Sequence, residues 1–333
     1  MTQVGSLVDQ FGRVHTSLRV SVTDRCNIRC FYCMPAENVQ FLPRGELLTY
    51  EEIVRFVKAA VQVGIRKLRI TGGEPLVRSD VSQLIQMLSE IEPIEEVALT
   101  TNGMLLSEQA QVLKRSGLER LNISLDALRE DTFRTIARRG GLERVLAGID
   151  AAQEAGFSNI RLNALAIPGL NEDQIIPLAE FARQRQLELR FIEFMPLDAE
   201  NHWQADQVLS GAHVRHLLES EFGQLSPVVR DDPSQPAVDY MYADCQSRVG
   251  FINSVTEPFC GDCNRLRLTA EGQVRNCLFS TTEWDARTIL RNHGSKVEII
   301  QLIKDCVWNK KAGHGMNAEG FVKPQRAMYQ IGG

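Results

Sequence analysis

The sequence predicts an α/β protein: a partial (β/α)6 barrel of the TIM type, with a smaller C-terminal region that closes its open side. The prediction starts from an alternation between residues 18 and 223, where short runs rich in Val, Ile and Leu alternate with helical stretches. Such runs are typical of strands that are buried on both faces of a parallel sheet. The chain has 333 residues, 44% of them apolar, which is enough for one large core and an appendage.

Six runs of residues are predicted to be strands. They cover residues 18–23, 67–71, 96–101, 120–126, 159–167 and 188–195. Between them, apolar residues recur at helical spacings, and Thr49 followed by Glu52 forms a capping box that predicts the start of the first helix. Because eight βα units close a barrel, six predict an incomplete one. An open doubly wound sheet is the alternative that periodicity alone does not exclude.

The composition of the chain divides it into two parts. Residues 226–237 are rich in Pro, Asp and Ser, which is typical of a linker. We therefore expect a barrel domain over residues 1–225 and a C-terminal region over residues 226–333.

The charge balance restricts the partners of the protein. With 37 basic and 42 acidic side chains, the net charge of −5 excludes nucleic-acid binding through bulk charge. An anionic ligand would therefore need a local concentration of arginines. Residues 1–10 lack the basic and apolar regions of a signal peptide, and no apolar run approaches the roughly 20 residues that span a bilayer. We expect a cytoplasmic protein with no nucleic-acid or membrane partner.

Six of the eight cysteines form two close groups. The first cysteine triplet is Cys26, Cys30 and Cys33, and the second cysteine triplet is Cys260, Cys263 and Cys277. In a reducing compartment, clustered cysteines favour metal ligation over disulfides. Three thiolates can hold three irons of a [4Fe–4S] cluster and leave the fourth iron open. Zinc is the alternative, and a structural zinc site would need a fourth ligand from elsewhere.

Other notable side chains are expected to be structural. Cys245 and Cys306 have no near partner, which favours small buried apolar residues. The pair Lys310-Lys311 is a short basic run that we expect to face water.

The predicted strands all end in polar, glycine or metal-binding residues, and parallel βα proteins gather functional side chains at these strand ends. In chain order these are the first cysteine triplet, Gly72-Gly73-Glu74-Pro75, Thr100-Thr101-Asn102-Gly103, Ser124 with Asp126, Arg161 with Asn163, and Glu193 with Met195. The two glycines would allow a close backbone approach to a ligand. The pattern predicts a single site.

Two arginines lie inside the second cysteine triplet. Arg265 and Arg267 are two residues apart, so on an extended segment their side chains point the same way. Two guanidinium groups on one face suit a phosphate chain. A solvated edge strand is the alternative.

The first cysteine triplet carries a family resemblance. The pattern Cys26-x3-Cys30-x2-Cys33, with Tyr32 before the last cysteine, resembles the radical S-adenosylmethionine (SAM) enzymes, as does the Gly-Gly-Glu-Pro segment. This resemblance implies a partial (β/α)6 barrel and SAM bound to the open iron. It also implies that an electron from the cluster splits SAM into methionine and a 5′-deoxyadenosyl radical.

With the second cysteine triplet, the whole chain resembles the GTP 3′,8-cyclase family of molybdenum cofactor biosynthesis. The resemblance implies two [4Fe–4S] clusters, one on each triplet, and conversion of GTP to (8S)-3′,8-cyclo-7,8-dihydroguanosine 5′-triphosphate. The GTP contacts that it implies are Arg19, Arg69, Thr100, Arg161, Arg265, Leu266 and Arg267. The SAM contacts that it implies are Tyr32, Gly73, Ser124 and Met195. A catalytic role is implied for Arg265, Arg267 and the tail Gly332-Gly333, which threads back into the site in this family.

The resemblance also implies partners. These are a flavodoxin- or ferredoxin-like electron donor and cyclic pyranopterin monophosphate synthase, which would receive the product, and a homodimer is left open. Two alternatives have other functions: a radical SAM enzyme that modifies a peptide and carries an auxiliary iron–sulfur cluster, and a zinc-stapled binding protein without catalysis.

Overall fold

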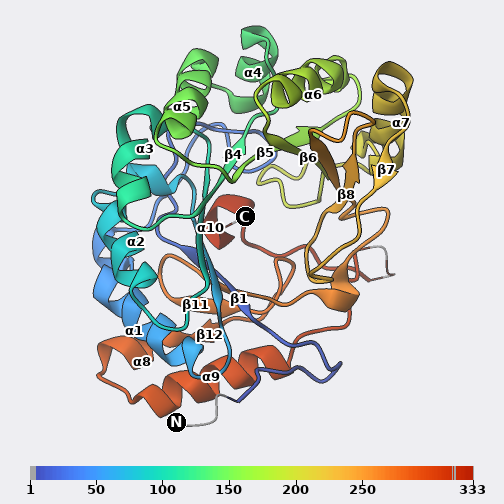
Figure 1. The fold of residues 1–333 in the computed structure, drawn as a ribbon. Coiled ribbons are helices and arrows are strands. Elements are labelled where there is room, and N and C mark those ends of the chain that lie inside the picture. Colours follow the sequence, from blue (N-terminus) through green and yellow to red (C-terminus); the bar gives the residue numbers. More distant parts are fainter. Residues whose placement is uncertain (1–4, 317, 319, 333) are drawn as a thin grey trace.

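The computed structural model of the chain, which describes residues 5–316, 318 and 320–332, is built around one sheet of 12 strands (Figure 1). Its centre consists of parallel strands that neighbour one another in chain order. These are β1 (Ser17–Ser21), β2 (Lys67–Thr71), β3 (Glu96–Thr101), β4 (Arg120–Ser124), β5 (Ile160–Ala166) and β6 (Glu188–Glu193). All six predicted strands are confirmed to within two residues at each end. A doubly wound sheet would reverse its strand order part-way, so that alternative is wrong.

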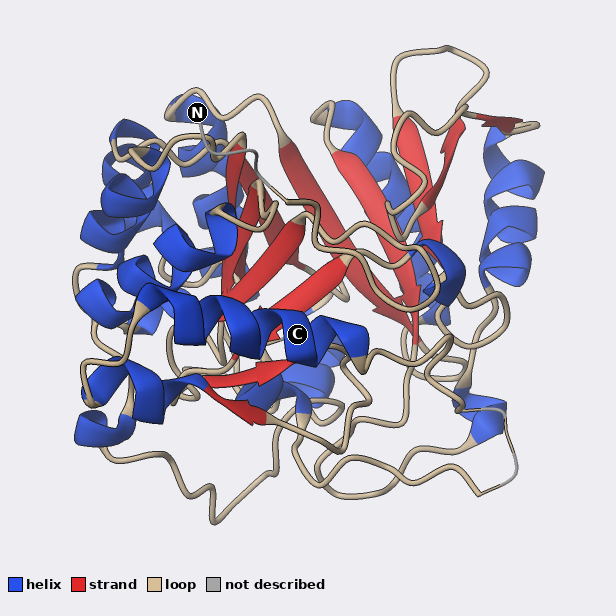
Figure 2. Cartoon of the chain, turned by 90° about the horizontal axis from the view of Figure 1, so that it is seen from below, coloured by secondary structure: helices blue, strands red, loops and turns tan. Residues whose placement is uncertain are grey.

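Helices cover the outer face of this curved array (Figures 1 and 2). They are α1 (Tyr50–Val61), α2 (Val81–Ser89), α3 (Leu106–Arg115), α4 (Glu130–Ala137), α5 (Leu142–Glu154), α6 (Ile175–Gln184) and α7 (Gly211–Phe222). The predicted capping box starts α1, because the backbone N–H of Glu52 donates to Thr49 Oγ1 at 3.2 Å and the N–H of Thr49 donates to Glu52 Oε2 at 2.8 Å.

The C-terminal region extends the sheet at both edges, in addition to the expected closure of the open side. The strand β9 (Arg248–Ile252) pairs in parallel with β6, and β10 (Arg265–Leu268) pairs in parallel with β1. The antiparallel strands β8 (Val238–Met241) and β7 (Ser226–Pro227) follow at one edge, and β11 (Gln273–Arg275) and β12 (Trp284–Asp285) follow at the other. The segment between β9 and β10 therefore joins the two edges of the barrel and crosses its open side.

Three further helices complete the C-terminal region. They are α8 (Ala286–Arg291), α9 (Lys296–Trp308) and α10 (Met328–Ile331). The helix α9 packs against α1 on the outside, whereas α10 and the C-terminal end of the chain lie in the centre of the barrel in Figure 1.

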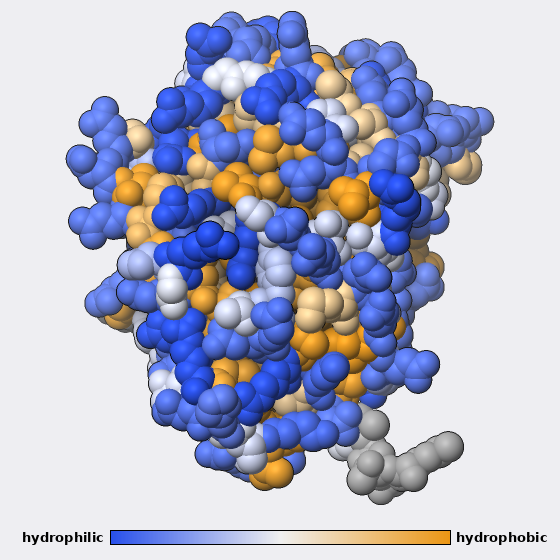
Figure 3. Space-filling view, turned by 90° about the vertical axis from the view of Figure 1, so that its left-hand side faces the viewer, coloured by the Kyte–Doolittle hydropathy of each residue, from blue (hydrophilic) through white to orange (hydrophobic). Residues whose placement is uncertain are grey.

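The alternation along each strand separates the core from the barrel interior. On β1, Leu18 and Val20 are fully buried, and Arg19 between them lines the interior cavity. On the face of the molecule that Figure 3 shows, hydrophilic side chains predominate and the apolar areas lie between them. Among the described residues, no helix is long and apolar enough to cross a membrane.

Candidate active site

A cavity of about 310 Å³ lies inside the barrel at the carboxyl ends of the strands. Both cysteine triplets line it, although they are more than 220 residues apart in the sequence. Every central strand, or the loop after it, contributes at least one lining residue, as the single predicted site requires. Among the residues implied by the family resemblance, those that line the cavity are Arg19, Tyr32, Arg69, Gly73, Thr100, Ser124, Met195, Arg265 and Arg267.

The loop after β1 carries the first cysteine triplet. The backbone N–H groups of Arg29 and Phe31 donate to carbonyls at the end of α4, at 2.9 and 3.1 Å, which fixes the loop over the barrel. Burial raises the pKa of Cys26 to about 11, and it also raises the pKa of Cys30 well above its usual value. The thiolate forms therefore need a positively charged partner, and iron is one. The Asn102 side-chain amide also lies 3.6 Å from Cys26 Sγ.

The two glycines after β2 pack against the chain that leads into the cysteine loop. A Cβ on Gly73 would lie 2.5 Å from the carbonyl oxygen of Arg25, and a Cβ on Gly72 would lie 2.5 Å from that of Thr23. The N–H of Gly73 donates to Thr23 O at 2.8 Å. The close approach expected at these glycines is thus made to the protein backbone itself, and this contact holds the cysteine loop in place.

We expect Gly73→Ala to destabilise the protein by about 1–3 kcal/mol, because the added methyl group overlaps backbone that cannot move without displacing the cysteine loop. The control is Gly45→Ala, where an added Cβ meets no atom within 4 Å. Urea unfolding of both variants measures the difference, and equal free energies of unfolding would contradict this account of the glycine.

Glu74 of the same segment joins two strand ends. Its carboxylate accepts hydrogen bonds from Thr101 Oγ1 at 2.8 Å and from the N–H groups of Asn102 and Leu76 at 2.6 and 3.0 Å. Burial raises the pKa of this carboxyl to about 7. The acidic residue of the motif therefore has a structural role, tying the end of β2 to the end of β3.

Tyr32 connects the cysteine loop to the end of β4. Its hydroxyl donates to Asp126 Oδ2 at 2.8 Å, and Asp126 Oδ1 accepts from the N–H of Leu165 at 2.8 Å. Burial raises the pKa of Asp126 to about 6. The ring of Tyr32 is thereby fixed at the wall of the cavity.

A row of arginines crosses three neighbouring strands at one level. Arg19 on β1 is in register with Arg267 on β10 and with Arg69 on β2. Burial is the main cause that lowers the pKa of Arg19, and the positive charges of Arg267 and Arg69 lower it further. The buried Nε of Arg19 has no hydrogen-bond partner among the described residues. Such a row is suited to a polyanion, which would relieve the repulsion between the guanidinium groups.

Two of the predicted substrate contacts lie away from the cavity. The Nε of Arg161 pairs with Glu188 Oε2 at 2.8 Å, and Arg161 is not among the lining residues. Leu266 is fully buried in the core. The structure instead places Arg190 in the cavity wall, held by its own pair with Glu188 at 2.5 Å.

The second cysteine triplet comes from the turn before β10, which carries Cys260 and Cys263, and from the loop after β11, which carries Cys277. Burial opposes ionisation of Cys263, but Arg265 and Lys310 outweigh it and lower the pKa of this thiol to about 6. Lys310 was expected to face water, and this is wrong because its Nζ lies 3.4 Å from Cys263 Sγ and only 3% of the residue is exposed.

The C-terminal tail returns to the arginine row. Arg267 Nη1 donates to the carbonyl oxygen of Gly332 at 2.5 Å. A Cβ on Gly332 would lie 2.9 Å from Thr71 and 3.0 Å from Ser21, at the ends of β2 and β1. The backbone φ of +77° at Gly332 also favours glycine. Gly333 lies outside the described residues.

Comparison with known proteins decides the family. The model of the radical SAM superfamily matches residues 20–182, and the model described as Molybdenum Cofactor Synthesis C matches residues 187–316. A curated relative from Rhodopirellula baltica, named GTP 3′,8-cyclase, is 52% identical over 337 residues, covering 100% of this chain and 94% of the relative. A relative of the same name from Streptomyces coelicolor is 44% identical over 328 residues, covering 98% and 96%. The chain belongs to the GTP 3′,8-cyclase family.

A solved structure agrees with the fold. That of Streptococcus suis SuiB, bound to S-adenosylmethionine, superimposes with a TM-score of 0.63 at 15% identity, covering 96% of this chain and 78% of that one. At this identity the likeness shows the fold alone, and it confirms the partial barrel.

Membership of the radical SAM superfamily implies one [4Fe–4S] cluster and SAM as cofactors. The residues present fit this group, because the three free cysteines of the first triplet line the cavity and burial raises the pKa of each thiol. Within the described part of the chain, no three His, Cys, Asp or Glu side chains converge closely enough to hold a single metal ion. A cube-shaped cluster does not need such convergence, since each thiolate binds a separate iron.

The structure adds residues to the site that the sequence analysis missed. Arg190 had a signal, because a charged residue between apolar neighbours in a predicted buried strand must face a cavity or a partner. Lys310 had none, since its neighbours in space come from β10. The other two cysteines differ from each other: Cys306 is fully buried as predicted, and the prediction that Cys245 is buried is wrong, because it is exposed in a turn.

Proposed function

We propose that this protein converts GTP to (8S)-3′,8-cyclo-7,8-dihydroguanosine 5′-triphosphate, the first step of molybdenum cofactor biosynthesis. One observation carries the proposal: both cysteine triplets and the arginine row line one cavity. The names of the curated relatives support it. A zinc-stapled binding protein would need neither the arginines nor the shared cavity.

The first cysteine triplet is proposed to hold the [4Fe–4S] cluster of the superfamily, with Tyr32, Gly73, Ser124 and Met195 around SAM. When bound, the cluster and SAM supply a 5′-deoxyadenosyl radical. The cysteine loop is held by the glycine contacts and by the end of α4, so the chain fixes the place where this chemistry starts.

The second cysteine triplet is proposed to hold a second [4Fe–4S] cluster, which would leave one iron free to bind the guanine of GTP. The arginine row, with Arg265 and Arg190, would bind the triphosphate. Thr100, which lines the cavity, is a further proposed contact. The proposed roles of Arg161 and Leu266 are indirect because neither lines the cavity, and Arg161 would act through Glu188, which it shares with Arg190.

In the overall change, one electron splits SAM, GTP loses one hydrogen atom and gains one C–C bond, and a second electron and a proton are then added. The C3′ hydrogen of the ribose passes to the 5′-deoxyadenosyl group, and a bond forms between C3′ and C8 of guanine. One electron and one proton then complete the dihydro product. The segment between β9 and β10, together with the tail at Gly332, covers the open side and would keep water from the carbon radical.

We also propose a role for each of the two parts of the chain and for the partners of the protein. Residues 1–225 carry the first cysteine triplet, and residues 226–333 carry the second and the Gly332-Gly333 tail, within one shared sheet. A flavodoxin- or ferredoxin-like donor would supply electrons, cyclic pyranopterin monophosphate synthase would take the product, and a homodimer is the assembly to test.

The test is an anaerobic reaction of the iron-loaded protein with SAM, a strong reductant and GTP deuterated at C3′. We expect 5′-deoxyadenosine that carries one deuterium, because the radical takes the C3′ hydrogen directly. Mass spectrometry of the nucleoside measures this. Unlabelled 5′-deoxyadenosine would remove GTP C3′ as the target and favour another substrate, such as a peptide.

A further inference from the structure

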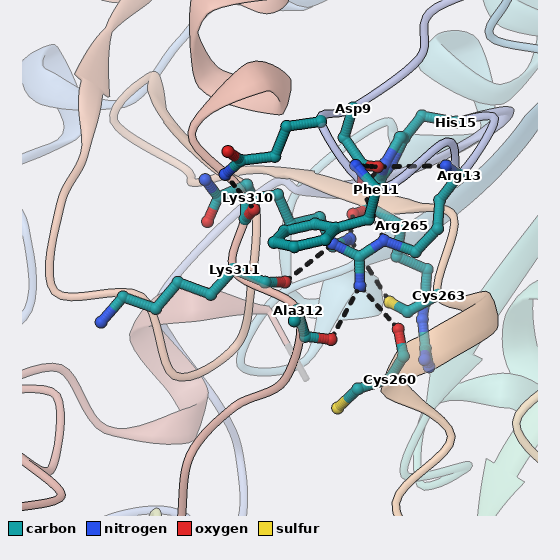
Figure 4. Close-up of polar contacts among 12 residues, drawn as sticks. Asp9, Phe11, Arg13, His15, Cys260, Cys263, Arg265, Lys310, Lys311 and Ala312 are labelled. Atoms are coloured by element: carbon teal, nitrogen blue, oxygen red, sulfur yellow. Dashed lines mark hydrogen bonds and ion pairs between the residues drawn. The ribbon is translucent and has the colours of Figure 1, made fainter.

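A turn near the N-terminus contains a buried ionic network outside the cavity. Asp9 Oδ2 accepts from Arg13 Nε at 2.6 Å and lies 3.0 Å from His15 Nε2 (Figure 4). The side chains of Asp9 and His15 are fully buried and that of Arg13 is 6% exposed. A buried ion pair is costly unless its remaining donors are also hydrogen-bonded. The partners of Arg13 Nη1 and Nη2 therefore indicate which part of the protein the network holds.

The guanidinium of Arg13 binds three backbone carbonyls of the C-terminal region. Its Nη1 donates to Cys260 O at 2.7 Å and to Ala312 O at 3.0 Å, and its Nη2 donates to Lys311 O at 2.7 Å (Figure 4). One arginine therefore joins a residue of the second cysteine triplet to the segment that follows α9. The guanidinium thus uses four of its five N–H donors, one on Asp9 and three on backbone carbonyls, an arrangement that lysine could not reproduce.

Lys310 stands at the start of that segment and reaches the triplet. Its Nζ lies 3.4 Å from Cys263 Sγ and donates to Arg265 O at 2.8 Å. Its own carbonyl accepts from the Gln10 side chain at 3.3 Å, so the N-terminal turn holds Lys310 as well. In Figure 4 the neighbouring Lys311 side chain points away from the cysteines, and it is exposed.

We propose that Lys310 donates a hydrogen bond to the Cys263 sulfur of the second cluster and raises its reduction potential, and that Arg13 positions Lys310 for this contact. The inference rests on the second cluster of the proposed function. Hydrogen bonds to the sulfur ligands and nearby positive charge stabilise the reduced, more negative cluster. Lys310 acts on the ligand directly, whereas Arg13 is a positioning residue that acts through Lys310.

The test isolates the second cluster in a chain that carries Cys26→Ala, Cys30→Ala and Cys33→Ala. In this background, Lys310→Met should lower the equilibrium constant for one-electron reduction about tenfold, which corresponds to about 59 mV. A redox titration followed by electron paramagnetic resonance measures the potential. Lys311→Met is the matched control and should leave the potential unchanged. Lys310→Arg keeps a cationic donor, so its potential should stay close to that of the chain with Lys310.

The role of Arg13 is tested by a double-variant cycle. Arg13→Met alone should shift the potential in the same direction as Lys310→Met, and adding it to Lys310→Met should produce no further shift, because both act through one contact. Additive shifts would overturn the positioning role. Circular dichroism confirms the fold of each variant.

The outcomes separate this inference from the proposal on which it rests. If the triple-alanine chain binds no iron and sulfide, the second cluster is absent. That result would overturn both the second cluster of the proposed function and this inference. If the cluster forms and Lys310→Met has the same potential as Lys311→Met, only the inference is overturned. The same lysine variants in the chain with both triplets provide a second measurement, in which one cluster signal shifts and the other does not.

Discussion

Replacing Cys30 by alanine should abolish the formation of 5′-deoxyadenosine from SAM. Cys30 lies in the middle of the first cysteine triplet, in the loop that the glycines after β2 and the end of α4 hold over the cavity. Two thiolates would not retain a four-iron cluster, so the bound iron should fall from about eight to about four atoms per chain. Iron analysis and chromatography of the SAM reaction measure both effects.

Cys245→Ala is the matched control for this prediction. Cys245 is an exposed free cysteine in a turn and does not line the cavity. Its replacement should leave the iron content and 5′-deoxyadenosine formation unchanged. Equal loss of iron in the two variants would mean that iron binds to cysteines without regard to the loop, and the assignment of the first cysteine triplet as cluster ligands would be wrong.

The barrel was predictable because its signals are local. Each central strand is a short apolar run followed by polar or glycine residues, and a parallel sheet makes both features necessary. The pairing of the flanking strands with the barrel was not predicted. Residues 248–252 and 265–268 are short, and they pair with β6 and β1, which lie far away in the sequence. Nothing within such a segment specifies an edge more than 50 residues away.

The site was predictable where chemistry depends on residue type and spacing, and not where it depends on the neighbours that a residue has in the folded chain. Arg161 and Arg190 lie on neighbouring strands, and Arg190 is in register with Asn163, two residues beyond Arg161. Arg190 lines the cavity, whereas Arg161 is in register with Glu188, pairs with it and does not line the cavity. Lys310 shows the same limit, because a lysine is buried only where acceptors and a thiolate from another part of the chain surround it.

Replacing Arg267 by alanine should weaken GTP binding by about 10- to 100-fold, the loss of one charge-assisted contact to a phosphate. Arg267 stands at one end of the arginine row, is 5% exposed, and donates to Gly332 O. Its removal therefore takes a positive charge from the cavity and also releases the tail. Equilibrium dialysis with GTP, in the absence of SAM and reductant, measures the dissociation constant without turnover.

Two further variants decide whether geometry or charge carries this contact. Arg267→Lys keeps the charge but not the planar fork, so it should recover only part of the affinity. Arg248→Ala removes an exposed arginine from β9, which lies beyond β6 on the other side of the same sheet, and should leave GTP binding unchanged. If Arg248→Ala weakens binding as much as Arg267→Ala does, the overall charge of the chain governs affinity. In that case the row of arginines across β10, β1 and β2 is not the triphosphate site. A chain with a net charge of −5 would then have to bind GTP at another surface.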